Sequence, residues 1–268
     1  MTSPIRPRTA SLYHASRAPV VDPIVAGATV ALAMATCIVA GALAPGELAF
    51  VAGQGGLAVA AIGVMVIVHP RRALAAIGLR GAQPRFFVAA IAIGATAWYL
   101  NVRLDDWVFS ELPLPRDDAE HLRGLIDRPP LVEALAEFAL LPALCEEIVF
   151  RGVLARSLGR RMALALAALV SAAVFSGFHL SLVQALPTLT LGIVLVVIAI
   201  RADSVLPAAL AHAINNAMAI AMSRDELPGI AGWLTRHPTA AALGCAATTA
   251  CGIAIAARGP SWTGSSVA

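Results

Sequence analysis

Two adjacent carboxylates and an arginine are the side chains in this sequence best suited to chemistry. Glu146, Glu147 and Arg151 lie in LLPALCEEIVFRG, residues 140–152, a segment that is otherwise mostly apolar. Each charge at bilayer depth costs at least ~2.5–3.5 kcal/mol, so function is the default hypothesis for such residues. Glu147 and Arg151 have i,i+4 spacing with the acid first, which favours an ion pair. Glu146 lies about 100° further around the helix and stays free for general acid–base work.

A structural salt bridge at a helix end is the simplest alternative for these three charges. Pro142, four residues before Glu146, removes a backbone donor, and we expect a helix kink beside the motif. Cys145 could be proposed as a nucleophile. An apolar environment disfavours the reactive thiolate, however, so we interpret Cys145 as a packing residue.

Further polar side chains lie in apolar segments downstream. His179 lies in VFSGFHL, and AHAINNA contains His212, Asn215 and Asn216. His212 and Asn216 have i,i+4 spacing and share a helix face, whereas Asn215 points elsewhere and is expected to hydrogen-bond to another helix. At about 1.5 Å per residue, His212 and Asn216 lie ~14 and ~20 Å from the cytoplasmic side, and His179 ~26 Å. His179 therefore reaches the others only if its helix tilts or begins outside the bilayer.

If these side chains meet, they suit hydrolysis of an amide bond without a covalent intermediate. Glu146, with His179, would deprotonate a water molecule and later protonate the leaving amine. His212 and Asn216 would donate hydrogen bonds to the tetrahedral oxyanion. The neighbouring ion pair would orient Glu146. The alternative is a zinc site in which Glu146, His179 and His212 surround an activated water, although the HExxH signature is absent.

The composition is typical of a polytopic membrane protein. Of the 268 residues, 59% are hydrophobic and 13% charged, against roughly 45–50% and ~25% in soluble domains. The net charge is +3, every basic residue is arginine, and no basic stretch is interleaved with aromatic residues. We therefore expect the lipid bilayer, and no nucleic acid, as a partner.

The predicted fold class is all-α, a membrane bundle of about eight helices with the site buried among the fourth, fifth and seventh. Residues 1–23 form a tail, residues 24–130 the first helices and a polar outer loop at 101–130, residues 131–222 the catalytic core, and residues 223–268 the last loop, helix and tail. Most of the predicted spans are uncharged runs, and the one at 132–158 carries the charged motif. The predicted spans are residues 24–44, 48–68, 86–100, 132–158, 162–179, 186–200, 205–222 and 240–257.

The arginines test this topology. With the N-terminus inside, twelve arginines fall in inner segments and six in outer loops, while Arg151 lies within the membrane. A two-to-one bias agrees with the positive-inside rule. Both termini are therefore predicted to be cytoplasmic, in the plasma (inner) membrane of a bacterium.

Three segments resemble the motifs of a known family. EEIVFRG, FSGFH with Phe175 and His179, and HAINN with His212 and Asn216 are similar to EExxxR, FxxxH and HxxxN of the CAAX-protease and bacteriocin-processing family. The resemblance covers about residues 131–222. It implies an intramembrane endopeptidase in which Glu146 and His179 activate water and His212 and Asn216 form the oxyanion hole. Members are labelled metalloproteases or read as glutamate-type enzymes. We favour the glutamate type, with no cofactor, and keep zinc as the alternative.

Other functions compete with this prediction. A membrane scaffold or bacteriocin-immunity factor would need no catalytic set, and a transporter would be expected to show related halves, which the sequence lacks. The expected substrate is a membrane-associated protein or peptide. Peptide processing, immunity and trimming of sorting tails remain open, as does the oligomeric state.

Overall fold

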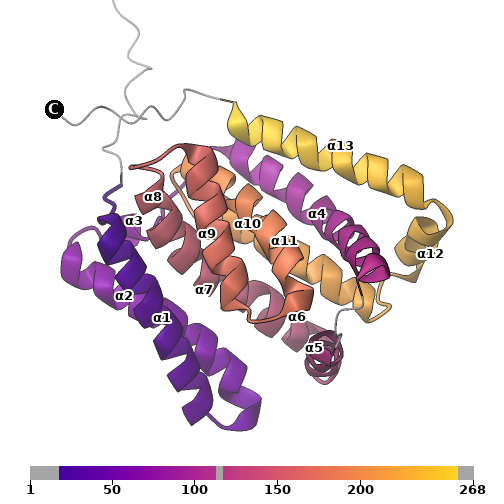
Figure 1. Cartoon of the computed structure of the whole chain (residues 1–268), viewed down its shortest axis with the longest axis horizontal. Helices are drawn as coiled ribbons and strands as arrows, with labels where there is room; N and C mark the ends of the chain where they lie inside the picture. The colour runs from indigo at the N-terminus through magenta and orange to yellow at the C-terminus, as the bar shows by residue number, and fades with distance from the viewer. Residues whose placement is uncertain (1–17, 113–116, 259–268) are drawn as a thin grey trace, which may run out of the picture.

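The computed structural model describes residues 18–112 and 117–258, and this part of the chain is a bundle of helices without strands (Figure 1). Most of the predicted tail, residues 1–17, lies outside the described residues. The first helices are α1 (Pro23–Leu43), η2 (Gly46–Leu48), α2 (Ala49–Val68), α3 (Ala73–Ala76), α4 (Pro84–Glu111) and α5 (Asp117–Asp127). The later ones are α6 (Leu131–Leu135), η3 (Ala136–Leu140), α7 (Leu141–Glu146), η4 (Glu147–Ala155), α8 (Arg156–Leu158), α9 (Leu164–Phe178), α10 (Leu182–Ala202), α11 (Leu206–Ser223), α12 (Pro228–Arg236) and α13 (Pro238–Ala257).

Five helices of the described chain are long and apolar enough to cross a membrane: α1, η2 with α2, α4, α10 and α13. The all-helical membrane class predicted from composition is therefore confirmed, with five candidate spans where eight were expected. The other three predicted spans have lower apolar content or length. Helix α9 has only 15 residues, α11 carries polar side chains, and the stretch from α6 to α8 carries buried charges.

The prediction of a long polar loop over residues 101–130 is wrong. Helix α4 continues to Glu111, and residues 117–127 form α5. The Arg103 and Asp106 side chains pair at 3.2 Å with i,i+3 spacing, and such pairs stabilise a helix outside the apolar region. A drop in hydropathy marks the place where a helix leaves the apolar part of the membrane. Helix α4 continues beyond that place.

The EEIVFRG motif lies in a continuous helical stretch from α6 to α8 that includes two π-helical segments. Residues 136–140 (η3) and 147–155 (η4) are π-helical and lie on either side of α7, which carries Pro142. π-Helical turns are rare in proteins, and those that do occur are frequently found at functional sites. Gly152 allows close packing here, because a Cβ atom at this position would clash with the carbonyl oxygen of Ile77.

Three groups of helices pack around this stretch. The α1–α2 hairpin packs against α7 and η4, α9 packs against η4 and α10, and α11 packs against η3, α7 and α4. Helix α13 lies along α4 (Figure 1). The largest core cluster joins α1, α2, η4 and α9, and includes Leu57, Phe150 and Phe175. The motif is therefore enclosed by elements from both halves of the chain.

A charged cluster fixes the end of the bundle beside the α10–α11 turn. Asp203 ends α10 in the left-handed conformation (φ 47°). Its carboxylate accepts from Arg80 at 2.8 Å and from Arg156 at 3.0 Å. The Ser204 hydroxyl donates to the carbonyl of Arg80 at 2.6 Å. These bonds join the α3–α4 connection to α8 and α11, and so fix the start of the helix that carries His212.

Candidate active site

Glu147 and Arg151 form the ion pair that their spacing predicts. The Arg151 Nη1 atom lies 2.9 Å from Glu147 Oε1, and both side chains are 0% exposed. The guanidinium carbon of Arg151 also lies 4.1 Å from the centre of the Phe175 ring, a distance suited to a cation–π contact. The pair is therefore enclosed between η4 and α9, where each charge is stabilised by the opposite charge of its partner.

His212, from α11, lies between the two glutamates. Its Nδ1 atom is 3.0 Å from Glu147 Oε1, and its Nε2 atom is 4.0 Å from Glu146 Oε2. An ionised carboxylate can only accept hydrogen bonds, so Nδ1 carries the hydrogen and Nε2 is directed toward Glu146. Glu147 thus contacts Arg151 and His212. From the sequence we expected the Glu147–Arg151 pair to orient Glu146.

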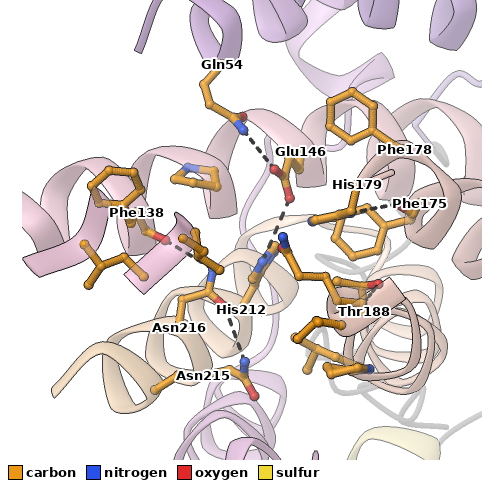
Figure 2. Close-up of a pocket in the computed structure, with 18 of the residues that line it drawn as sticks. Gln54, Phe138, Glu146, Phe175, Phe178, His179, Thr188, His212, Asn215 and Asn216 are labelled. Carbon is orange, nitrogen blue, oxygen red and sulfur yellow. Dashed lines mark hydrogen bonds and ion pairs between the residues drawn. The ribbon is translucent and has the colours of Figure 1, made fainter. Parts of the chain in front are cut away.

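Glu146 has a different neighbour, Gln54 of α2. The carboxylate is 4% exposed, and its Oε1 atom accepts a hydrogen bond from Gln54 Nε2 at 2.9 Å (Figure 2). Its Oε2 atom is the one that lies near His212. Gln54 was not among the site residues predicted from the sequence. Its side-chain amide in the otherwise apolar run 49–68 is the sequence feature that indicates a functional residue.

Asn216 reaches from α11 to the stretch that carries the motif. Its Nδ2 atom donates to the carbonyl of Phe138 at 3.4 Å. Pro142, four residues after Phe138, has no N–H to offer that carbonyl. Among the described residues, Asn215 donates to Asn216 Oδ1 of its own helix, at 3.3 Å. The prediction that Asn215 makes the interhelical bond is therefore wrong, because it is Asn216 that spans the two helices.

His179 lies immediately after α9. Its Nδ1 atom is 3.0 Å from the carbonyl oxygen of Phe175, so this nitrogen carries the hydrogen and Nε2 is free to act as an acceptor. The Phe175 ring makes edge contacts with His179 and His212 at centroid distances of 4.9 and 5.9 Å. Figure 2 shows the His179 ring directed toward the space beside Glu146. Phe175, the first residue of the FxxxH motif, thus packs against both imidazole rings.

One cavity of about 750 Å³ contains most of these side chains. Glu146, His179, His212 and Asn216 line it, and Asp105 is the other charged residue among the described lining. Most of the remaining lining is apolar and comes from α1, α2, α4, α5, η3, α7 and α9 to α11. Cys145 is buried in the core cluster, in agreement with a packing role. The three motifs therefore converge on one apolar cavity with polar groups on its wall.

The described side chains do not form a ready metal site. A catalytic zinc ion needs three protein ligands around it. Among the described residues, no group of three or more His, Cys, Asp or Glu side chains is placed to hold a metal ion. Glu146, His179 and His212 are therefore not arranged as a three-ligand zinc site among the described residues, and the zinc alternative stays a prediction.

Comparisons with known proteins agree with the motif resemblance. Residues 129–218 match the family model described as Type II CAAX prenyl endopeptidase Rce1-like. No curated protein and no solved structure matches the chain. The matched segment contains all six predicted site residues and nearly coincides with the predicted core at 131–222, while Gln54 lies outside it. Over residues 129–218 the chain is therefore similar to a family of peptidases, the Rce1-like type II CAAX prenyl endopeptidases, as its three motifs predict.

Proposed function

We propose that this protein is an intramembrane endopeptidase of glutamate type. The observation that carries the proposal is the approach of Glu146 and His212 to 4.0 Å on the wall of a largely apolar cavity that His179 and Asn216 also line. Arg151 pairs with Glu147, so the buried carboxylate of Glu146 is the one without an arginine partner and is suited to proton transfer.

In this mechanism Glu146 and His179 activate the water. The water oxygen attacks the carbonyl carbon of the peptide, and at the same time Glu146 Oε2 accepts a proton from that water. The carbonyl π bond opens to a tetrahedral oxyanion. When the C–N bond breaks, Glu146 returns the proton to the leaving nitrogen and a carboxylic acid and an amine are released. His179 Nε2 accepts a hydrogen bond from the water and orients it.

His212 and Asn216 stabilise the oxyanion. The 3.4 Å bond from Asn216 to Phe138 is long, so its N–H group can turn to a stronger acceptor at little cost. His212 can donate from Nε2 only when both ring nitrogens carry hydrogen. Glu147, 3.0 Å from Nδ1, balances the charge of that form. The ion pair with Arg151 thus orients the oxyanion donor.

The substrate in this proposal is an apolar segment of a membrane protein or peptide. The lining is mainly hydrophobic and aromatic, as ligand sites commonly are, and its few polar groups fix orientation. Zinc hydrolysis by the same residues, a scaffold or immunity role and a transporter are the competing proposals. We favour hydrolysis because a scaffold does not require a buried acid, two histidines and an amide around one cavity.

The proposal is tested by comparing the termini of membrane proteins in cells that carry this chain and in cells that lack it. We expect new termini at or near membrane segments only where the wild-type chain is present. Identical termini in both membranes would contradict the peptidase and favour a scaffold or immunity factor.

We further propose eight passes through the plasma membrane of a bacterium, with both termini cytoplasmic. The twelve-to-six arginine bias supports this topology, and the start of α1 and the end of α13 lie at the same end of the bundle (Figure 1). Reporter fusions after Arg17, Asp117 and Arg258 are expected to report inside, outside and inside. An outside signal from the C-terminal fusion would rule out an even number of passes.

Replacing Asn216 with alanine is expected to lower kcat by roughly 10²–10³-fold with little change in KM, the usual result of removing one oxyanion donor. Asn216→Asp should lose as much, because a carboxylate of the same size cannot donate. The control is Gln83→Ala at the start of α4, outside the cavity. A rise in KM at constant kcat would instead assign Asn216 to substrate binding.

Chelation distinguishes this mechanism from the zinc alternative. The glutamate-type enzyme should keep its activity in the presence of a strong chelator, measured on purified protein with its metal content determined in parallel. If stoichiometric zinc and activity are lost together and zinc restores both, the mechanism is wrong. The residues at the site would stay the same, since both mechanisms use Glu146, His179 and His212.

A further inference from the structure

Gln54 is the one side chain outside residues 129–218 that hydrogen-bonds to a proposed catalytic residue among the described residues. It lies in α2, is 5% exposed, and its Nε2 atom is 2.9 Å from Glu146 Oε1. The rest of α2 is apolar. A side-chain amide in such a place is costly unless it is hydrogen-bonded. The bond to Glu146 therefore accounts for the amide.

The chemistry of the two groups fixes the direction of this bond. An ionised carboxylate only accepts, so the NH₂ end of Gln54 must face Glu146 and the Oε1 end must face away from it. Gln54 Oε1 is buried and has no hydrogen-bond partner among the described residues. Glu146 is left with one oxygen bonded to Gln54 and the other near His212.

From this geometry we infer that Gln54 is a positioning residue of the peptidase, an inference that rests on the proposed function. It holds Glu146 Oε1, so that Oε2 is the oxygen that faces His212 and takes the proton from water. Without the bond, the carboxylate could rotate about its last torsion and present either oxygen in a range of directions. Positioning errors of this kind lower the rate of the chemical step, and they affect the affinity for substrate less.

The α1–α2 hairpin is built to hold Gln54 still. A Cβ atom at Gly56 would lie 2.9 Å from the carbonyl oxygen of Thr36, so the two backbones are in close contact. Leu57 of α2 is fully buried in the core cluster. The hairpin also supplies a wall of the cavity, through Cys37, Gly41, Phe50 and Gly53 among others. The first two helices thus complete a site whose motifs all lie elsewhere.

The experiment replaces Gln54 with methionine, which has nearly the same size and no amide. Kinetics are measured on a fluorogenic peptide made from a cleavage sequence found in the comparison of termini. We expect kcat to fall about 10- to 100-fold, with KM within about threefold and an unchanged melting temperature. Gln54→Asn, whose amide is one methylene shorter, should also lose kcat, and it serves as the second variant if Gln54→Met fails to fold.

Thr29→Val is the matched control. It also removes a buried polar group from the hairpin, but within the described part of the chain the Thr29 hydroxyl bonds to the carbonyl of Val25 in its own helix. The value of kcat should therefore not change. The inference is overturned if a folded Gln54 variant keeps wild-type kcat, if KM rises instead, or if Thr29→Val loses as much. If the wild-type protein cleaves the peptide and the Gln54 variants cleave it equally well, this inference alone is refuted. Wild-type protein that cleaves nothing refutes the proposed function and this inference together.

Discussion

Replacing Glu146 with glutamine is expected to abolish peptide hydrolysis while the protein stays folded. The amide cannot take a proton from water, and loss of a positioned general base costs typically 10²–10⁴-fold. The fold should persist because the amide oxygen of glutamine can still accept the bond from Gln54. The measurement is kcat on the purified protein, together with its melting temperature.

Glu133→Gln is the matched control for this substitution. Glu133 is exposed on α6 and belongs to the same helical stretch, but it does not line the cavity. Its replacement should leave kcat and melting unchanged. Normal cleavage by Glu146→Gln would contradict the assignment of the general base, and the structural salt-bridge interpretation of the motif would then be preferred.

Replacing Arg151 with alanine is expected to destabilise the protein strongly as well as inactivate it. Arg151 and Glu147 are both fully buried, and removing one partner of a buried ion pair typically costs ~3–5 kcal/mol because the other charge is left alone. The contact of Arg151 with the Phe175 ring is lost too. The measurement is the free energy of unfolding, or the melting temperature, in the same detergent as the wild type.

Arg236→Ala provides the comparison for that loss. Arg236 is exposed on α12, and surface substitutions usually change stability by less than ~0.5 kcal/mol. The two substitutions are therefore predicted to have different effects: Glu146→Gln loses activity alone, whereas Arg151→Ala loses both stability and activity. Unchanged melting in both variants would show that the Glu147–Arg151 pair does not support the fold.

The sequence by itself determines the helical membrane class and the local pair. Uncharged runs of about 20 residues predict spans because backbone groups in lipid must be bonded within their own helix. The pairing of Glu147 with Arg151 is equally local, since i,i+4 spacing brings them together. His212 and Asn216 could be assigned to one face of α11 for the same reason. The family resemblance also follows from residue order alone.

Hydropathy was a less certain guide to where helices end. The third span was predicted to stop at residue 100, whereas α4 continues to Glu111. Polar residues can continue a helix outside the membrane through pairs such as Arg103 and Asp106. A drop in hydropathy therefore marks a change of solvent, while the end of the helix depends on backbone hydrogen bonds and caps.

Only the tertiary structure decided which partner each polar side chain takes. Gln54 is 92 residues from Glu146 in the chain, and His212 is 65 residues from Glu147. The carbonyl of Phe138, which Pro142 cannot satisfy, is bonded by Asn216 and not by Asn215. Helical periodicity gives the direction of a side chain from its own axis, but not the rotation, tilt and depth of the neighbouring helix. Those depend on how whole helix faces pack, and so the same packing that buries the ion pair assigns Gln54 to Glu146.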